Sequence, residues 1–179
     1  MIVWINGAFG SGKTTIAALL ANKMHHAHIY DPEQVGYFLW DVFPAPMKRK
    51  GNFQHIPMWR DFNYQILLYM AQQYDGDLIV PMTIYNRQYY DEIIERLRAD
   101  QIEVRHFILM AEKQTILQRL AQRGEPADGW AAQHIDVCLH AFHHDIPCEK
   151  IDTENRSTEE IASDIVRRLQ STIVESLQS

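Results

Sequence analysis

Short apolar runs alternate with longer segments of helical periodicity along most of the chain. The apolar runs lie at residues 1–5, 27–30, 78–83, 102–110 and 148–152, and the last is the weakest. Their lengths are typical of strands, and the first and third are nearly continuous in apolar residues, as in strands buried on both faces. Five strands that alternate with helices predict an α/β fold in which helices cover both faces of a parallel sheet.

The helices are expected between these strands, where apolar residues recur every three or four positions. They are predicted at residues 16–21, 31–40, 57–73, 90–97, 112–123, 130–142 and 157–173. Two of them carry start signals. Asp31 and Pro32 suit the N-cap and the first helical position, and Ser157 forms a capping box with Glu160. Residues 124–129, with the sequence GEPADG, form the most obvious mobile loop.

Composition indicates a single soluble domain of enzyme size. The chain has 179 residues, 46% hydrophobic and 22% charged, and we expect residues 1–179 to form one domain. The formal charge of −6 disfavours a nucleic-acid partner, because domains that bind nucleic acids usually carry a basic surplus. Two cysteines make no disulfide framework, and the first strand leaves no room for a signal peptide. No apolar run approaches the roughly 20 residues that span a bilayer, so we expect a cytoplasmic protein without a transmembrane segment.

A phosphate-binding motif follows the first strand. Residues 7–14, with the sequence GAFGSGKT, match the pattern G-x-x-x-x-G-K-[ST]. Its glycines allow the backbone to wrap an anion with the N–H groups pointing inward. Lys13 adds a mobile positive charge for the β- and γ-phosphates, and the Thr14 hydroxyl is a Mg²⁺ ligand, so the motif predicts a nucleoside triphosphate with Mg²⁺. The residues expected to hold the nucleotide are Gly7, Ala8, Phe9, Gly10, Ser11, Gly12, Lys13, Thr14 and Thr15.

Asp31 is the best candidate for the second half of the site. It follows the second apolar run, and ligands collect at the carboxyl ends of parallel strands. A carboxylate there could accept a proton from a substrate hydroxyl or help to hold Mg²⁺. The alternative is a helix N-cap, and both roles can hold at once. Thr83 takes the place at the end of the third strand where many enzymes of this kind have an aspartate, and the chain has no Asn-Lys-x-Asp motif, which disfavours a GTPase.

Four arginines are further candidates for contacts with phosphate or substrate. Arg119 and Arg123 are four residues apart on the predicted helix that leads into the mobile loop, so they share one face. From there they could close over a triphosphate and neutralise charge in the transition state. Arg60, beside aromatic residues, and Arg87, just past the third strand, could reach an acceptor substrate. The alternative for all four is an ordinary solvated surface position.

Five blocks of the sequence resemble the tunicamycin resistance ATP-binding protein family. They lie at residues 4–14, 30–33, 59–64, 79–84 and 130–136, and the resemblance extends to about residue 160. More broadly, the chain is similar to small P-loop kinases such as shikimate kinase, chloramphenicol phosphotransferase and the nucleoside monophosphate kinases. The resemblance implies a P-loop NTPase three-layer sandwich with strand order 2-3-1-4-5 and an arginine-bearing lid at about residues 119–130. It also implies ATP as the nucleotide and an adenine contact after the fifth strand, with Thr153 and Asn155 as binding residues.

The motif, Asp31 and the paired arginines together favour a Mg²⁺-dependent kinase that moves the γ-phosphoryl group of ATP to a hydroxyl of a small molecule. The resemblance links the acceptor to tunicamycin or another nucleoside or sugar compound. Two alternatives stay open: a binding protein that sequesters tunicamycin unmodified, and a kinase for an ordinary metabolite. The expected catalytic residues are Lys13, Asp31, Arg119 and Arg123, the expected acceptor contacts are Asp31, Arg60 and Arg87, and the expected metal ligands are Thr14 and Asp31.

Overall fold

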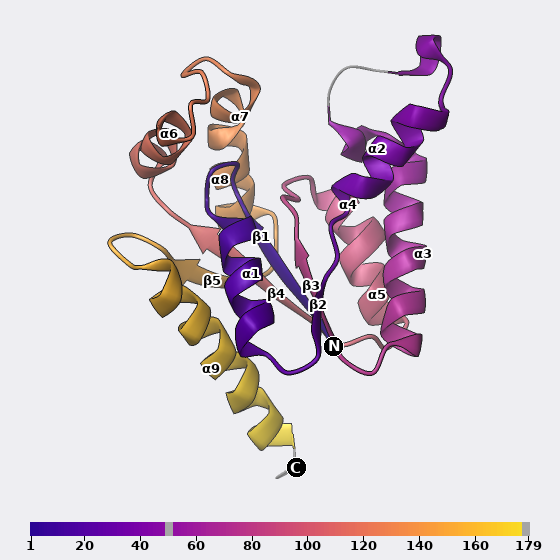
Figure 1. Ribbon diagram of the computed structural model, residues 1–179, viewed down its shortest axis with the longest axis vertical. Helices are drawn as coiled ribbons and strands as arrows, with labels where there is room; N and C mark the ends of the chain where they lie inside the picture. Colours follow the sequence, from indigo (N-terminus) through magenta and orange to yellow (C-terminus); the bar gives the residue numbers. More distant parts are fainter. Residues whose placement is uncertain (49–51, 177–179) are drawn as a thin grey trace.

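The computed structural model describes residues 1–48 and 52–176 and contains a five-stranded parallel sheet (Figure 1). The strand order is β2-β3-β1-β4-β5, which confirms the order implied by the resemblance to small kinases. The central strand β1 pairs in parallel with β3 on one side and β4 on the other. The carboxyl ends of the strands therefore meet at one edge of the sheet. The strands are β1 (Ile2–Gly7), β2 (Ala27–Ile29), β3 (Asp77–Pro81), β4 (Val104–Met110) and β5 (Glu149–Asp152).

Helices connect the strands and pack on both faces of the sheet (Figure 1). They are α1 (Lys13–Lys23), α2 (Glu33–Val42), α3 (Pro57–Gln73), α4 (Arg87–Tyr90), α5 (Arg96–Ala99), α6 (Lys113–Gln122), α7 (Trp130–Gln133), α8 (Ile135–His144) and α9 (Thr158–Ser176). Short single-turn segments η1 (Ala45–Met47) and η2 (Phe53–His55) lie between α2 and α3, and a π-helical segment η3 (Asp91–Glu95) joins α4 to α5.

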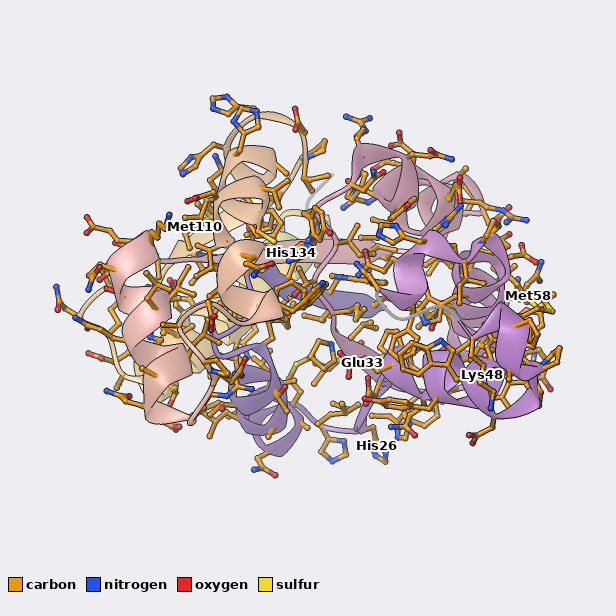
Figure 2. The ribbon with its side chains drawn as sticks, turned by 90° about the horizontal axis from the view of Figure 1, so that it is seen from above. His26, Glu33, Lys48, Met58, Met110 and His134 are labelled. Carbon is orange, nitrogen blue, oxygen red and sulfur yellow. The ribbon has the colours of Figure 1, made fainter. Side chains whose placement is uncertain are left out.

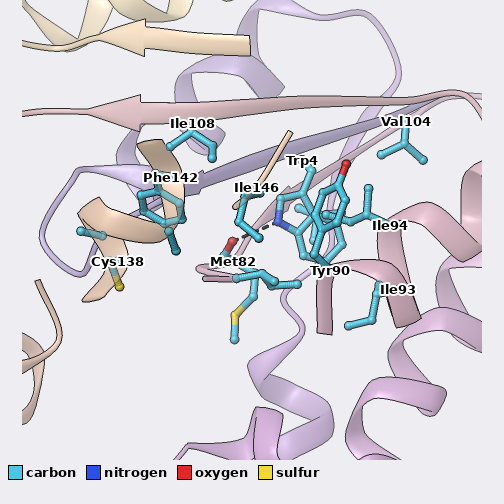
Figure 3. Packing of buried hydrophobic residues seen from close by; sticks show 14 of the residues in the cluster. Trp4, Met82, Tyr90, Ile93, Ile94, Val104, Ile108, Cys138, Phe142 and Ile146 are labelled. Carbon is cyan, nitrogen blue, oxygen red and sulfur yellow. Dashed lines mark hydrogen bonds between the residues drawn. The ribbon is translucent and has the colours of Figure 1, made fainter. Parts of the chain in front are cut away.

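Alternate residues of β1 divide the core into two layers. Val3 and Ile5 pack with residues of α1 and α9, whereas Ile2 and Trp4 pack with residues of α2, α3 and α8 on the other face. This is the period of two expected of a strand buried on both sides. The indole Nε1 of Trp4 donates a hydrogen bond to the carbonyl oxygen of Met82 at 3.0 Å, which ties the chain after β3 to the central strand (Figure 3). The three-layer sandwich is therefore the observed architecture.

A buried polar network holds the end of β1. The Oδ1 atom of Asn6 accepts hydrogen bonds from the backbone N–H groups of Gly7 at 2.8 Å and Ile84 at 3.0 Å. Its Nδ2 atom donates to the Ile84 carbonyl at 2.8 Å and lies 3.1 Å from Nε2 of His106. The other ring nitrogen of His106 lies 3.0 Å from the Pro147 carbonyl. Because a carbonyl can only accept, Nδ1 carries the proton and Nε2 accepts from Asn6, so the network requires a neutral imidazole.

The structure corrects several predicted boundaries. Residues 130–142 form two helices rather than one, because the chain breaks at His134, whose Nδ1 lies 2.7 Å from the Trp130 carbonyl. The fourth strand begins at residue 104 rather than 102. Gln101 adopts a left-handed φ of 63°, and the N–H of Ile102 bonds back to the Leu97 carbonyl at 3.0 Å, so these residues still belong to the preceding helix end. The predicted capping box is present, since Ser157 and Glu160 exchange side-chain and backbone hydrogen bonds.

Burial of His106 gives a testable pH dependence of stability. Burial lowers the pKa of His106 to about 4 from an ordinary 6.5. Between these values the unfolded chain binds the extra proton and the folded chain does not, so stability falls as the pH drops. We expect a loss of about 2 kcal/mol in the free energy of unfolding between pH 7 and pH 5, measured by urea denaturation.

The variant His106→Gln is the control for this prediction, because glutamine offers a hydrogen-bonding side chain that does not titrate. Its unfolding free energy should change much less between pH 7 and pH 5. The same slope in the variant and the native protein would contradict the assignment. Carboxylates whose pKa is lowered, such as Asp164 and Glu95, ionise below pH 5. They therefore contribute little to the change in stability between pH 5 and pH 7.

Candidate active site

The P-loop, residues 7–14, joins β1 to α1 at the carboxyl edge of the sheet. Gly7 takes a φ of 148°, and a Cβ atom there would lie 2.5 Å from the Ser11 Oγ and 3.0 Å from the Leu109 carbonyl oxygen. A glycine is therefore required for the loop to curl back on itself. The Ser11 hydroxyl inside this curl is buried and has no hydrogen-bond partner among the described residues. The loop therefore curls around a space in which the Ser11 hydroxyl is available for a further hydrogen bond.

Lys13 places a partly buried ammonium in this loop. Its Nζ atom donates to the carbonyl oxygens of Gly7 at 3.1 Å and Ala8 at 3.0 Å and lies 5.6 Å from the centroid of the Phe9 ring. Burial lowers the pKa of Lys13 to about 8. Among the described residues no carboxylate lies within ion-pair distance of this ammonium. A buried cation without an anionic partner costs free energy, and a bound phosphate would remove that cost.

A cavity of about 560 Å³ opens in front of the loop, and we name it the phosphate cavity. It brings together Lys13 and Thr14 of the P-loop, Asp31 and Glu33 at the start of α2, and Arg123 at the end of α6. Figure 2 looks down on this edge and shows Glu33 and His134 on opposite groups of helices near the middle of the view. The other lining residues are Phe9, Gly10, Ile29, Pro81, Met82, Thr83, Glu125, Pro126, Gly129, Trp130 and Ala131.

Asp31 lies just before α2 and also lines the phosphate cavity. Its Oδ1 accepts a hydrogen bond from the N–H of Glu33 at 3.0 Å, and its Oδ2 accepts from the side-chain amide of Gln34 at 3.3 Å. The N-cap residue of α2 is Pro32 rather than the expected Asp31, but the Asp31 carboxylate still bonds to the first residue of the helix while it lines the phosphate cavity with Lys13 and Thr14. These two hydrogen bonds restrict the orientation of the carboxylate.

The oxygen atoms around the cavity suit Mg²⁺ without enclosing it. The Thr14 hydroxyl and the Asp31 carboxylate line the same cavity and are hard oxygen ligands of the kind that Mg²⁺ prefers. The Thr83 hydroxyl is already used, because it donates to the Gly7 carbonyl at 2.8 Å. In residues 1–48 and 52–176 no group of three His, Cys, Asp or Glu residues could hold a metal ion. A Mg²⁺ here would therefore take most of its ligands from phosphate and water.

The structure separates Arg119 from Arg123. Arg123 lines the phosphate cavity and pairs with Glu125, Nη2 to Oε1, at 3.3 Å. Arg119 turns to the segment after β5 and donates to the hydroxyl and the carbonyl of Thr153, both at 3.1 Å. Asn155, two residues further on, takes a left-handed φ of 52°. Arg119, Thr153 and Asn155 thus share the end of β5, away from the lining of the phosphate cavity.

Neither Arg60 nor Arg87 lines a described cavity at this edge. Arg60 is 5% exposed; its guanidinium donates to the Glu92 carboxylate and to the Gln54 carbonyl, and it stacks 4.3 Å from the centroid of the Tyr89 ring. Arg87 is exposed and pairs with Asp91 at 2.8 Å. The guanidinium of Arg60 is therefore held by protein groups and that of Arg87 by Asp91, and their role as acceptor contacts stays a prediction.

A second cavity of about 420 Å³ adjoins the first, and we name it the aromatic cavity. The two cavities share four lining residues, Phe9, Glu33, Met82 and Trp130. The remaining lining residues of the aromatic cavity are Tyr37, Trp40, Asn52, Phe53 and Gln54. The sequence analysis did not identify this cavity. The signal that could have found it is the spacing of residues 33, 37 and 40, which places three polar or amphipathic side chains on one face of α2.

Trp130 connects the loop at 124–129 with the P-loop. Its ring packs edge-on against Phe9, with centroids 4.5 Å apart, and lies 4.2 Å from the ring of His134. The Trp130 side chain is 44% exposed, so it covers the boundary between the two cavities without being locked in the core. An aromatic contact of this kind contributes about 1 kcal/mol, which is small enough to break and reform.

The comparisons with known proteins agree with this geometry. A family model described as AAA domain, AAA_33, matches residues 2–143. The chain belongs to this family. The comparison with curated protein sequences gave no match.

Solved structures share the fold over nearly the whole chain. The tunicamycin resistance protein of Deinococcus radiodurans is 28% identical, covers 94% of each chain and has a TM-score of 0.79. A sugar kinase from Janibacter sp. is 17% identical with 94% of each chain covered and a TM-score of 0.69. Shikimate kinase of Aquifex aeolicus is 16% identical, with coverages of 97% and 99% and a TM-score of 0.58. This chain is therefore a P-loop kinase-like domain, and this fold implies nucleotide binding.

In the part of the chain that the structure describes, no helix has both the length and the apolar character that crossing a bilayer requires.

The depressed pKa of Lys13 makes nucleotide binding pH-dependent. Above about pH 8 the free protein loses the Lys13 proton, and a neutral amine attracts phosphate less than an ammonium. Binding must then take up a proton, so the affinity for ATP should fall roughly tenfold between pH 7.5 and pH 9. Calorimetric titration in buffers of different ionisation enthalpy measures both the affinity and the proton uptake.

Two lysine variants test the origin of this slope. Lys13→Arg keeps a cation that does not titrate in this range and should bind ATP with little pH dependence. Lys113→Arg changes an exposed lysine of α6 that pairs with Asp136 and should keep the native slope. An equally steep slope in Lys13→Arg would show that another group carries the effect.

Proposed function

We propose that this protein is a Mg²⁺-dependent kinase that transfers the γ-phosphoryl group of ATP to a hydroxyl of a small molecule. The observation that carries the proposal is the position of Asp31, a fixed carboxylate in the same cavity as Lys13 and Thr14 and next to a second, aromatic cavity. One cavity then holds the donor and the other the acceptor, and Glu33 of α2 lines both of them.

Each residue has a defined task in this reaction. ATP supplies the phosphoryl group and Mg²⁺ the charge neutralisation on its oxygens. The P-loop N–H groups and Lys13 bind the phosphates, and the Thr14 hydroxyl and the Asp31 carboxylate would hold Mg²⁺. The acceptor hydroxyl gives its proton to Asp31 as the hydroxyl oxygen bonds to the γ-phosphorus of ATP. At the same time the bond between that phosphorus and the β,γ-bridging oxygen breaks, and ADP leaves.

The segment at residues 119–130 acts as the lid in this proposal. Arg123 neutralises charge on the transferring group from within the phosphate cavity. Arg119 acts through Thr153, because its guanidinium donates hydrogen bonds to the hydroxyl and the carbonyl of that residue. It thereby positions the segment that contains Thr153 and Asn155, which would contact the adenine. We place the reaction in the cytoplasm, where ATP is abundant and the two free cysteines, Cys138 and Cys148, would stay reduced.

Tunicamycin is one candidate acceptor, because a neighbour with 28% identity is named as a tunicamycin resistance protein. The same likeness favours a second candidate function, in which the chain sequesters the drug without modifying it. The aromatic cavity supports either role, since aromatic side chains supply a large area for binding. The two functions differ in whether phosphate reaches the bound molecule.

A labelled-ATP assay with tunicamycin and a panel of nucleosides and sugars tests the kinase. Replacing Asp31 with Asn should lower label transfer about a hundredfold or more, because the proton acceptor is lost. Folding should change little, because the asparagine side-chain oxygen can also accept the hydrogen bond from the Glu33 N–H. Asp61→Asn, an exposed carboxylate paired with Arg96 outside both cavities, is the matched control and should transfer label as the native protein does.

Two outcomes would decide against this proposal. If ATP binds but label reaches no acceptor, and tunicamycin is recovered unmodified by mass spectrometry from a stoichiometric complex, the chain is a binding protein. If Asp31→Asn keeps full transfer while Glu33→Gln abolishes it, the proton acceptor is Glu33, which also lines both cavities.

A further inference from the structure

The aromatic cavity has the walls of a site for a flat ring. Phe53 lies 4.1 Å from Trp40 and 5.3 Å from Tyr37, measured between ring centroids. The Phe53 ring rests directly on α2, because a Cβ atom at Gly36 would come within 2.3 Å of its Cγ. Trp130 and Phe9 close the side toward the P-loop. Aromatic walls of this kind favour a planar, polarisable guest over a sugar alone.

Three of the residues that line this cavity carry a buried polar atom without a hydrogen-bond partner among the described residues. They are the Trp40 Nε1, the Asn52 Nδ2 and the Gln54 Oε1. Gln54 itself is 1% exposed. Buried polar groups are nearly always paired, and an unpaired one is costly. Three around one cavity therefore point to a ligand that completes them.

The protein network fixes which atom of each amide is free. The Nε2 of Gln54 donates to the Thr83 carbonyl, so its Oε1 is left as an acceptor. The Oδ1 of Asn52 accepts from the Gln54 N–H at 3.0 Å, so its Nδ2 is left as a donor. The Trp40 indole can only donate. The free set is therefore one acceptor and two donors.

We infer that the aromatic cavity binds the acceptor through a planar cyclic imide, a ring with an N–H between two carbonyl groups, as in uracil. Such a ring donates once, to Gln54, and accepts twice, from Trp40 and Asn52, which is the complement of the free set. The inference rests on the proposed function, which makes this cavity the acceptor side. The imide class then determines which small molecules are accepted.

The ring site is tied to the phosphate site by direct hydrogen bonds. Gln54 is held at its carbonyl by Arg60 and at its amide by Thr83, and the Thr83 hydroxyl bonds to the Gly7 carbonyl at 2.8 Å. Arg60 is thus a positioning residue for the ring site rather than a substrate contact. A ring seated on Gln54 takes a fixed position relative to the P-loop, which places a hydroxyl on an attached sugar toward Asp31 and Glu33.

Three nucleosides test the pairing with the full chain and no ATP. Uridine, 3-methyluridine and cytidine are titrated by ligand-observed NMR. Uridine should bind at least tenfold more tightly than 3-methyluridine, which lacks the N–H, and than cytidine, which offers an acceptor at that position. Equal binding of the three, tighter binding of guanosine than of uridine, or no binding of uridine at millimolar concentration would overturn the inference.

A conservative variant assigns the pairing to its residue. Trp40→Phe keeps a ring and removes the N–H, and it should weaken uridine binding roughly tenfold while leaving the already weak binding of cytidine unchanged. Tyr69→Phe, on the exposed side of α3 and outside both cavities, is the control and should bind as the native protein does. Unchanged uridine affinity in Trp40→Phe would remove the indole from the site.

The inference and the proposed function can fail separately. Selective uridine binding without label transfer from ATP to any uridine-containing compound would leave the ring site standing and reject the kinase. Label transfer to sugars that carry no imide, without selective uridine binding, would leave the kinase standing and reject the ring site.

Discussion

The side-chain amide of Asn6 is the contact on which the arrangement of both cavities depends. It ends the central strand, fixes the first N–H of the P-loop at Gly7, and pairs with both backbone groups of Ile84 after β3. Two further hydrogen bonds extend this network. The Thr83 hydroxyl donates to the Gly7 carbonyl, and the side-chain amide of Gln54 donates to the Thr83 carbonyl. The network works only while His106 is neutral, and burial of that imidazole keeps it so at ordinary pH. The position of the nucleotide loop and the position of the aromatic cavity are therefore set by one buried amide.

The same physical cause, loss of solvent, shapes the chemistry at the other end of the loop. Lys13 is desolvated and is paired only with carbonyl oxygens, so its positive charge is poorly stabilised until an anion arrives. Carbonyl oxygens stabilise an ammonium less than a carboxylate does, and the phosphates of a nucleotide can replace them. The free protein is thus somewhat destabilised at the place where binding energy is to be gained, a common feature of sites for charged ligands.

The fold and the position of the P-loop could be predicted from sequence because their signals are local. The strand runs, the capping box at Ser157 and the P-loop spacing each depend on residues close together in the chain. The surroundings of Arg60 and the aromatic cavity could not be predicted in this way. Arg60 looked free for substrate, but Glu92 and Tyr89, about thirty residues later, hold its guanidinium. The helix break at His134 likewise depends on tertiary packing that no local pattern encodes. The same is true of the aromatic cavity, which Trp40 and Trp130 line from distant parts of the chain.

The charges around the phosphate cavity bear on the need for a metal. Its lining holds two cations, Lys13 and Arg123, and three carboxylates, those of Asp31, Glu33 and Glu125. Arg123 is paired with Glu125, whereas Lys13 has no carboxylate within ion-pair distance among the described residues, and the carboxylates of Asp31 and Glu33 line the same cavity. A triphosphate brings several negative charges into this surrounding, and repulsion from Asp31 and Glu33 would oppose it. A divalent cation between those carboxylates and the phosphate oxygens would attract both, so the electrostatic repulsion would become an attraction. The carboxylates at the start of α2 therefore favour a metal-bound nucleotide over a free one.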